Sequence, residues 1–152
     1  MSSDVRPGQC RCGGTRFEAA GEPLLTMACH CRGCQLMTSG AFSLSSLYDA
    51  SRFTLHGEAV RGGLKSGPDH RFCKDCMSWL FTVPEGMEDY VNVRSSLFDD
   101  PAAHRPFIEC WTSEGLGWAK TGAERSFATV PQDEEFGELV AAYAAWDEKV
   151  MR

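Results

Sequence analysis

Residues 27–40 are MACHCRGCQLMTSG, a stretch that places three cysteines, Cys29, Cys31 and Cys34, within six positions. A structural zinc site takes four ligands and a disulfide takes two, so three thiols complete neither. His30 lies between the first two cysteines. The stretch is therefore a structural site that needs a ligand from elsewhere, a redox cluster, or a metal site with one position left open for chemistry.

Two smaller cysteine clusters flank this stretch, CRCGG at residues 10–14 and FCKDC at residues 72–76. Two cysteine pairs that lie far apart in the chain, as these do, can form one closed, four-thiolate zinc site. Such a zinc is structural, and its binding energy contributes to the free energy of folding. We expect each pair to sit on a turn, so that the zinc ties the N-terminal strand to a hairpin. Its ligands would be Cys10, Cys12, Cys73 and Cys76.

This assignment leaves three thiolates for a second zinc, whose fourth position stays open to water or to an exogenous thiol. Other assignments are possible on spacing alone: Cys31 and Cys34 could join another pair, or His30 could close the site. In an extended segment His30 would point away from its cysteine neighbours, which favours a hydrogen-bonding role behind the ligands. A redox or incidental thiol cluster is the alternative to zinc, and an open site can lose its metal and oxidise.

The whole chain has the composition of one soluble globular domain, residues 1–152, at 43% hydrophobic and 24% charged. A net charge of -6 argues against nucleic acid as a partner. No apolar run approaches the length of a membrane span, and the N-terminus lacks a secretory signal. We therefore expect a cytoplasmic protein; the sequence does not specify an oligomeric state.

Short alternating runs separated by Gly, Pro, Ser and Asp predict a mostly antiparallel β domain. The expected strands are residues 15–18, 41–48, 53–55, 59–64, 78–83, 90–94 and 107–112. Apolar residues at helical spacing predict one amphipathic C-terminal helix over about 132–149, with acidic residues in its first turn. Cys110, in a strand-like segment, is expected to be a buried free thiol.

The cysteine clusters and their surroundings resemble the glutathione-dependent formaldehyde-activating enzyme (GFA) family, which is grouped with the CENP-V proteins. The resemblance covers residues 8–118 and is carried by CRCGG, CHCRGC followed by TSGAFS, RFCKDC, SSLFDDP and PFIECW with a later Trp118. It implies the Mss4-like, zinc-bound β-tent fold and two zinc ions per chain. The structural zinc would bind Cys10, Cys12, Cys73 and Cys76, and the second, open zinc would bind Cys29, Cys31 and Cys34.

The resemblance also implies that glutathione binds near the second zinc and reacts with formaldehyde to give S-hydroxymethylglutathione, which is carbon–sulfur lysis in reverse. An open zinc would lower the pKa of a substrate thiol, which attacks the carbonyl. His30 is a candidate proton donor, although a purely structural histidine is an equal alternative. A different class of function is a non-catalytic zinc protein that binds thiols or a protein partner.

Two positions depart from the family pattern. Met77 follows Cys76 where the family has glycine, so we expect the turn there to avoid positive φ. Gln35 follows Cys34 where a basic residue is common, which removes a cation that could lower a thiolate pKa or hold a substrate carboxylate. The arginines available to the carboxylates of glutathione, each expected to be a solvated surface residue, are Arg32, Arg71, Arg94 and Arg105.

Overall fold

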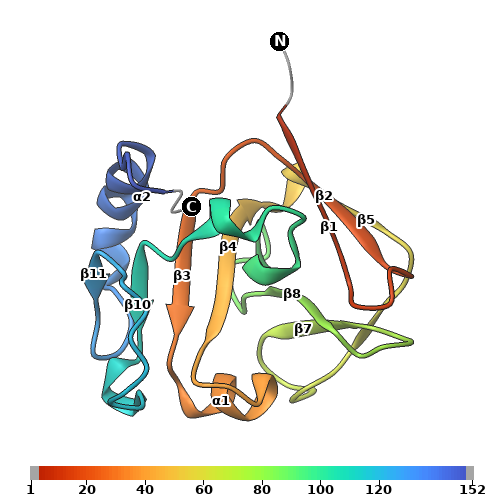
Figure 1. Ribbon diagram of the computed structural model, residues 1–152, viewed down its shortest axis with the longest axis horizontal. Coiled ribbons are helices and arrows are strands. Elements are labelled where there is room, and N and C mark those ends of the chain that lie inside the picture. Colours follow the sequence, from red (N-terminus) through yellow and green to blue (C-terminus); the bar gives the residue numbers. More distant parts are fainter. Residues whose placement is uncertain (1–3, 150–152) are drawn as a thin grey trace.

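The computed structural model describes residues 4–149, whose strands form two β-sheets (Figure 1). The smaller sheet has three antiparallel strands in the order β1-β2-β5: β1 (Val5–Gln9), β2 (Arg16–Ala20) and β5 (Phe53–His56). The larger sheet has eight strands in the order β11-β10-β3-β4-β9-β8-β7-β6. These are β3 (Leu25–Cys29), β4 (Ser43–Asp49), β6 (Ala59–Arg61), β7 (Asp69–Cys73), β8 (Trp79–Val83), β9 (Tyr90–Arg94), β10 (Ile108–Cys110) and β11 (Arg125–Ser126).

The prediction of a mainly β domain is confirmed, but one part of the larger sheet is not antiparallel. Strand β10 runs parallel to both β3 and β11. Parallel neighbours need a long connection, and β3 and β10 are joined by most of the remaining strands of the sheet. In this ladder Cys29 and Cys110 are register partners, so β10 runs beside the strand that ends in the three-cysteine stretch.

Strands β1, β3, β7 and β11 were not predicted. In β1 the hydrophobic alternation is interrupted by Pro7 and Gly8. Proline is tolerated because β1 is an edge strand. Gly8 is required by close packing, since a Cβ there would lie 2.2 Å from Phe17 Cζ and 2.6 Å from the carbonyl oxygen of Leu97.

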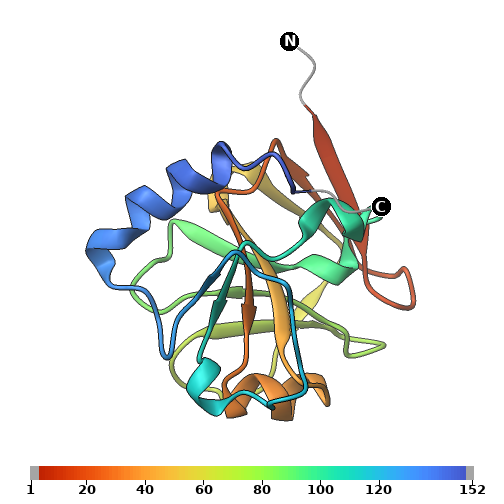
Figure 2. The same ribbon diagram turned by 60° about the vertical axis from the view of Figure 1, so that its left-hand side comes forward.

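The larger sheet is covered on both faces. Leu47 of β4 packs in a cluster with Leu139 and Tyr143 of the C-terminal helix, and the next residue, Tyr48, packs in a cluster with Phe17 of the smaller sheet. Neighbouring residues of a strand point to opposite faces. Helix α2 (Phe136–Ala144) therefore covers one face and the smaller sheet covers the other (Figures 1 and 2).

Helix α2 is shorter than predicted. A 3-10 turn, Asp133–Glu135, precedes it, and the helix ends at Ala144 instead of continuing to about 149. Two contacts account for the early end: Trp146 turns back onto the ring of Phe107, at 5.1 Å between centroids, and Lys149 Nζ donates to the carbonyl of Ala144 at 3.0 Å.

Helix α1 (Arg32–Thr38) was not predicted, because its seven residues carry the cysteine spacing and not a helical pattern. It lies at one end of β3 and β4 and connects them (Figure 1). The remaining 3-10 turns are Ala50–Arg52, Ser95–Leu97, Pro101–His104 and Thr112–Glu114.

Candidate metal centres

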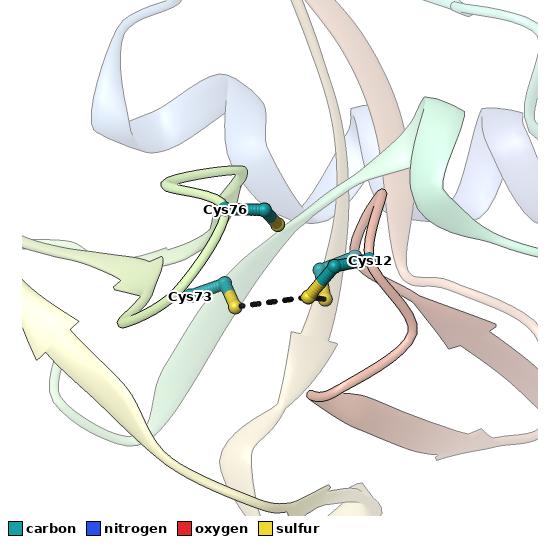
Figure 3. A group of neighbouring side chains, drawn as sticks. Cys12, Cys73 and Cys76 are labelled. Atoms are coloured by element: carbon teal, nitrogen blue, oxygen red, sulfur yellow. Dashed lines mark hydrogen bonds between the residues drawn. The ribbon is translucent and has the colours of Figure 1, made fainter.

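The first candidate centre joins the two sheets. Cys10 and Cys12 lie in the turn between β1 and β2, whereas Cys73 is the last residue of β7 and Cys76 lies in the turn that leads from it to β8. The prediction that each pair lies on a turn is confirmed. Figure 3 shows the sulfur atoms of Cys12, Cys73 and Cys76 converging from the two turns.

The spacing of the four sulfur atoms fits a tetrahedral metal ion. A zinc ion with Zn–S bonds of about 2.3 Å places its sulfurs about 3.8 Å apart. Here all four lie within 4.8 Å of one another, with 3.5 Å between Cys10 and Cys12 and 3.8 Å between Cys12 and Cys73. All eight cysteines are free thiols. The group therefore has the chemistry and the geometry of a four-thiolate site.

Donors around this centre favour ionised sulfur. The backbone N–H groups of Gly14 and Thr15 donate to Cys12 and Cys10 at 3.4 and 3.3 Å. Hydrogen bonding from the Ser78 hydroxyl, at 3.2 Å, and from neighbouring backbone N–H groups lowers the pKa of Cys76 to about 5. Such donors orient metal-binding thiolates and balance their charge.

The expectation for Met77 is wrong. Met77 adopts the left-handed conformation at φ 59°, as a glycine would. Its backbone N–H donates to the carbonyl of Cys73 at 3.0 Å, which closes the turn that brings Cys73 and Cys76 together. The requirement that both sulfurs reach one centre outweighs the steric cost of the Met77 Cβ, which is about 1–2 kcal/mol.

The second candidate centre consists of Cys29, Cys31 and Cys34, whose sulfurs lie within 4.8 Å of one another. Cys29 ends β3 and Cys34 belongs to α1. Cys31 is the N-cap of α1, and its sulfur accepts from the backbone N–H of Cys34 at 3.3 Å. The cysteine spacing therefore matches the start of this helix: the N-cap and the first turn carry two thiols that lie close to the thiol at the end of β3.

The two groups are separate, so Cys31 and Cys34 do not join another cysteine pair. Among residues 4–149, no histidine or carboxylate side chain completes the three-cysteine group within the same spacing. The three thiols are half-buried. The arrangement therefore offers a metal ion three ligands from the chain.

A serine supports the second centre as Ser78 supports the first. The Ser43 hydroxyl donates to Cys34 Sγ at 3.1 Å. Hydrogen bonding from Cys29 is the largest influence on Cys34, and with help from Ser43 and Cys31 it outweighs burial and lowers the pKa of the Cys34 thiol to about 5. Cys34 is therefore disposed to be a thiolate, the form that binds metal.

His30 is buried, with its side chain 3% exposed, and it does not belong to the group of candidate ligands. Its Nε2 lies 2.8 Å from Glu109 Oε2. Burial raises the pKa of Glu109, but hydrogen bonds from Ser126, Thr121 and His30 outweigh this and lower it overall. The imidazole is thus held by a carboxylate rather than by a backbone carbonyl, and its Nδ1 has no hydrogen-bond partner in the described chain.

Gln35 has a role that the sequence did not reveal. Its side chain is buried, and its Nε2 donates to the backbone carbonyls of His30, at 2.8 Å, and Glu114, at 3.0 Å. The side chain therefore ties the start of α1 to the segment that precedes it and to the loop after β10. A lysine or arginine here would have to abandon these bonds to reach the cysteines.

The expectation that Arg94 is a solvated surface residue is wrong. Arg94 is 8% exposed, and its guanidinium carbon lies 4.0 Å above the ring of Trp79. Burial lowers the pKa of Arg94 to about 10, while the charges of Cys34 and Cys29 act in the opposite direction. Gln35 places no cation next to Cys34, but Arg94 of β9 provides one that acts on the thiols of Cys34 and Cys29. Cys110, in contrast, is a buried free thiol as predicted.

One comparison with known proteins, with sequence models of families, agrees with the cysteine geometry. The sequence model of one family, described as glutathione-dependent formaldehyde-activating enzyme, matches residues 5–114. The chain belongs to this family. A crystal structure of a Rhodobacter sphaeroides protein is similar at 17% sequence identity and a TM-score of 0.48, covering 61% of this chain and 87% of that one. A search of the curated proteins gave no match.

Family and geometry together define a protein with two cysteine groups that can bind metal ions, consistent with zinc. In the part of the chain that the structure describes, none of the helices is both long and apolar enough to cross a membrane.

Proposed function

We propose that the protein joins formaldehyde to glutathione, giving S-hydroxymethylglutathione, and that the reaction occurs at Cys29, Cys31 and Cys34. The observation that carries this proposal is the separation of the two cysteine groups in a member of the GFA family. Cys10, Cys12, Cys73 and Cys76 can complete a tetrahedron without help. The other three thiols are left with an unfilled position, which is the arrangement of a catalytic zinc site.

In this proposal the two zinc ions have different roles. The four-cysteine site is structural and holds the smaller sheet against the β7–β8 hairpin. At the second site Cys29, Cys31 and Cys34 would hold the zinc ion, which would supply the positive charge that lowers the pKa of a bound substrate thiol. The sites are assigned to zinc because thiolate ligands in tetrahedral spacing are typical of zinc.

The chain's own residues hold the three thiols in place. Ser43 donates to Cys34, and Gln35 fixes the turn that carries Cys31 by binding the carbonyl of His30. Glu109 holds the His30 ring through the contact between its Oε2 and His30 Nε2, at 2.8 Å. We assign His30 a positioning role through these bonds, because both its carbonyl and its Nε2 are engaged by neighbours that belong to other elements.

The reaction is balanced without a redox step. One carbon–sulfur bond forms between the glutathione sulfur and the formaldehyde carbon; the sulfur loses a proton and the carbonyl oxygen gains one. The reverse reaction is a carbon–sulfur lysis. Thiols add to formaldehyde without a catalyst, so the protein has to contribute mainly proximity and a thiolate at neutral pH.

The test is turnover measured beside thiol binding. Formaldehyde loss with glutathione should be faster with the zinc-loaded protein than without it, and Cys31→Ala should remove the difference. Glutathione should also change the visible spectrum of the cobalt-substituted protein, because this spectrum reports on ligands that bind at the open position. No spectral change with two metals bound would contradict the open site.

The same assay separates the proposed enzyme from a non-catalytic thiol-binding protein. A rate equal to that of the blank, together with saturable glutathione binding, would favour the binding function. Variants of Cys110, a buried thiol outside both groups, provide the control: Cys110→Ala should retain both turnover and the spectral response.

A further inference from the structure

A cavity of about 360 Å³ is lined by residues that contact a cysteine of each group, although no cysteine is itself part of its lining. Ser43, which donates to Cys34, lines it from one side, and Ser78, which contacts Cys76, lines it from another. Arg94 and Trp79 form a further part of its wall. A cavity of this size is at the small end of ligand sites and suits one part of a small molecule.

The register of the larger sheet places Arg94 close to the thiols. Cys29 pairs with Ser43, and Ser45, two residues further along β4, pairs with Arg94. Residues two apart on a strand share a face. Arg94 therefore lies on the same face as Cys29 and Ser43, one strand further across the sheet.

Arg94 is a buried cation whose hydrogen-bonding capacity is mostly unused. A guanidinium has five N–H donors. Within the described residues, the side chain of Arg94 donates one hydrogen bond, from Nη2 to the carbonyl of Asn92 at 3.2 Å, and its Nε is buried without a partner. No carboxylate of residues 4–149 forms an ion pair with it.

The guanidinium is also held in a fixed orientation. It lies over the ring of Trp79, and Trp79 Nε1 in turn donates to Thr82 Oγ1 at 3.1 Å. His70 packs edge-on against the same ring, with 5.4 Å between the ring centroids. A planar fork held on an aromatic face, with free donors, is the arrangement that recognises a carboxylate by paired hydrogen bonds.

We propose that Arg94 binds a carboxylate of the thiol substrate in this cavity. The substrate class is then a thiol acid, of which glutathione is one example. This inference rests on the proposed function for the location of the thiol, but the carboxylate site itself can be tested without it. The alternative is that Arg94 serves only to balance the charge of the cysteine thiolates. That role does not require the unpaired N–H donors that Arg94 has, whereas binding a carboxylate does.

The first experiment uses the zinc-loaded protein and two ligands that differ only in the carboxylates. S-methylglutathione has both carboxylates but no free thiol, and its diethyl ester has neither. We expect the ester to bind about tenfold to a hundredfold more weakly, because hydrogen bonds to a charged group contribute about 1.5–3 kcal/mol. Calorimetric titration measures both dissociation constants.

The second experiment assigns the preference to Arg94. In Arg94→Gln the two ligands should bind with similar affinity. Arg71→Gln, which removes an arginine on β7 that is already paired with Asp69, should retain the full preference. If Arg94→Gln does not fold, Arg94→Lys keeps the buried charge but not the planar fork, and the preference should be reduced.

The inference is overturned if S-methylglutathione and its ester bind the wild-type protein alike, if neither binds, or if the Arg94 variants keep the preference. Failure of the proposed function looks different. 2-Mercaptoethanol has no carboxylate, so it tests the open position alone. If the cobalt spectrum does not respond to 2-mercaptoethanol, the thiol site is contradicted. An Arg94-dependent preference for S-methylglutathione over its ester would still support the carboxylate site in that case.

Discussion

The hydroxyl of Ser43 lies 3.1 Å from the sulfur of Cys34, and the same serine is the cross-strand partner of Cys29. Ser43 of β4 thus contacts the Cys34 thiol of α1 and is paired with Cys29 at the end of β3. Because β4 is an interior strand of the larger sheet, this contact connects the three-cysteine group to a strand that is paired on both sides.

Ser43→Ala should weaken metal binding at the three-cysteine site by about tenfold to a hundredfold, as is typical when a residue that orients a metal ligand is removed. Competition with a chromophoric chelator measures this affinity. Ser45→Ala is the matched control, because Ser45 lies two residues along β4 and is also buried. Equal loss in both variants would contradict a specific role for Ser43.

Metal content should distinguish the two centres. We expect two metal ions per chain in the wild type and one in Cys31→Ala, with the fold retained. Cys73→Ala should instead lose the closed site that joins the two sheets, and the protein should unfold or become insoluble. Elemental analysis with circular dichroism checks both results; a single metal ion in the wild type would contradict the assignment of two sites.

Gln35→Leu should destabilise the protein by about 1–3 kcal/mol, because it leaves the carbonyls of His30 and Glu114 without their donor in a buried position. Urea unfolding measures the change. Gln9→Leu, at an exposed glutamine of β1, should have little effect. A Gln35 variant as stable as the wild type would show that the two carbonyls find other donors.

Met77→Gly should stabilise the protein by about 0.5–1 kcal/mol. The substitution removes the steric cost of a left-handed residue, about 1–2 kcal/mol. Glycine also gives the unfolded chain more conformational entropy, which offsets part of this gain. The side chain is 54% exposed, so little packing is lost. Met77→Ala, which keeps a Cβ, should not stabilise; stabilisation in both variants would indicate a side-chain effect instead.

The stability of the protein should fall below neutral pH through His104. Burial first, and then Arg6, lower the pKa of His104 to about 4, against the opposing effect of Asp100. The unfolded chain therefore binds a proton near pH 6.5 that the folded chain does not accept until about pH 4, so stability is lost as pH falls through this range.

The expected loss from His104 between pH 7 and pH 5 is about 2 kcal/mol. His104→Gln retains a group that can bond the Ser46 hydroxyl, which lies 2.8 Å from Nδ1. Urea unfolding of both proteins at each pH separates this effect from loss of metal, which is common to both. An unchanged pH dependence in His104→Gln would contradict the assignment.

Sequence alone determined the mainly β class and located the three cysteine clusters. Their division into a four-cysteine and a three-cysteine group was one of several assignments that the spacing allowed, and the structure separated them. Metal ligation needs particular residue types, and the short spacing within each cysteine pair was enough to predict turns at Cys10–Cys12 and at Cys73–Cys76. The alternation within strands such as β8 and β9 reports which residues face a core, and that signal is local.

Tertiary structure decided the features that depend on residues far apart in the chain. The parallel placement of β10 beside β3 brought Glu109 to His30, and the pairing of β4 with β9 brought Arg94 to the cavity that Ser43 also lines. No local pattern distinguishes Arg94 from the other arginines, since burial of a charge is fixed by its neighbours in space. The local turn at Met77 was decided the same way, because convergence of sulfurs from two sheets outweighed the intrinsic preference of one residue.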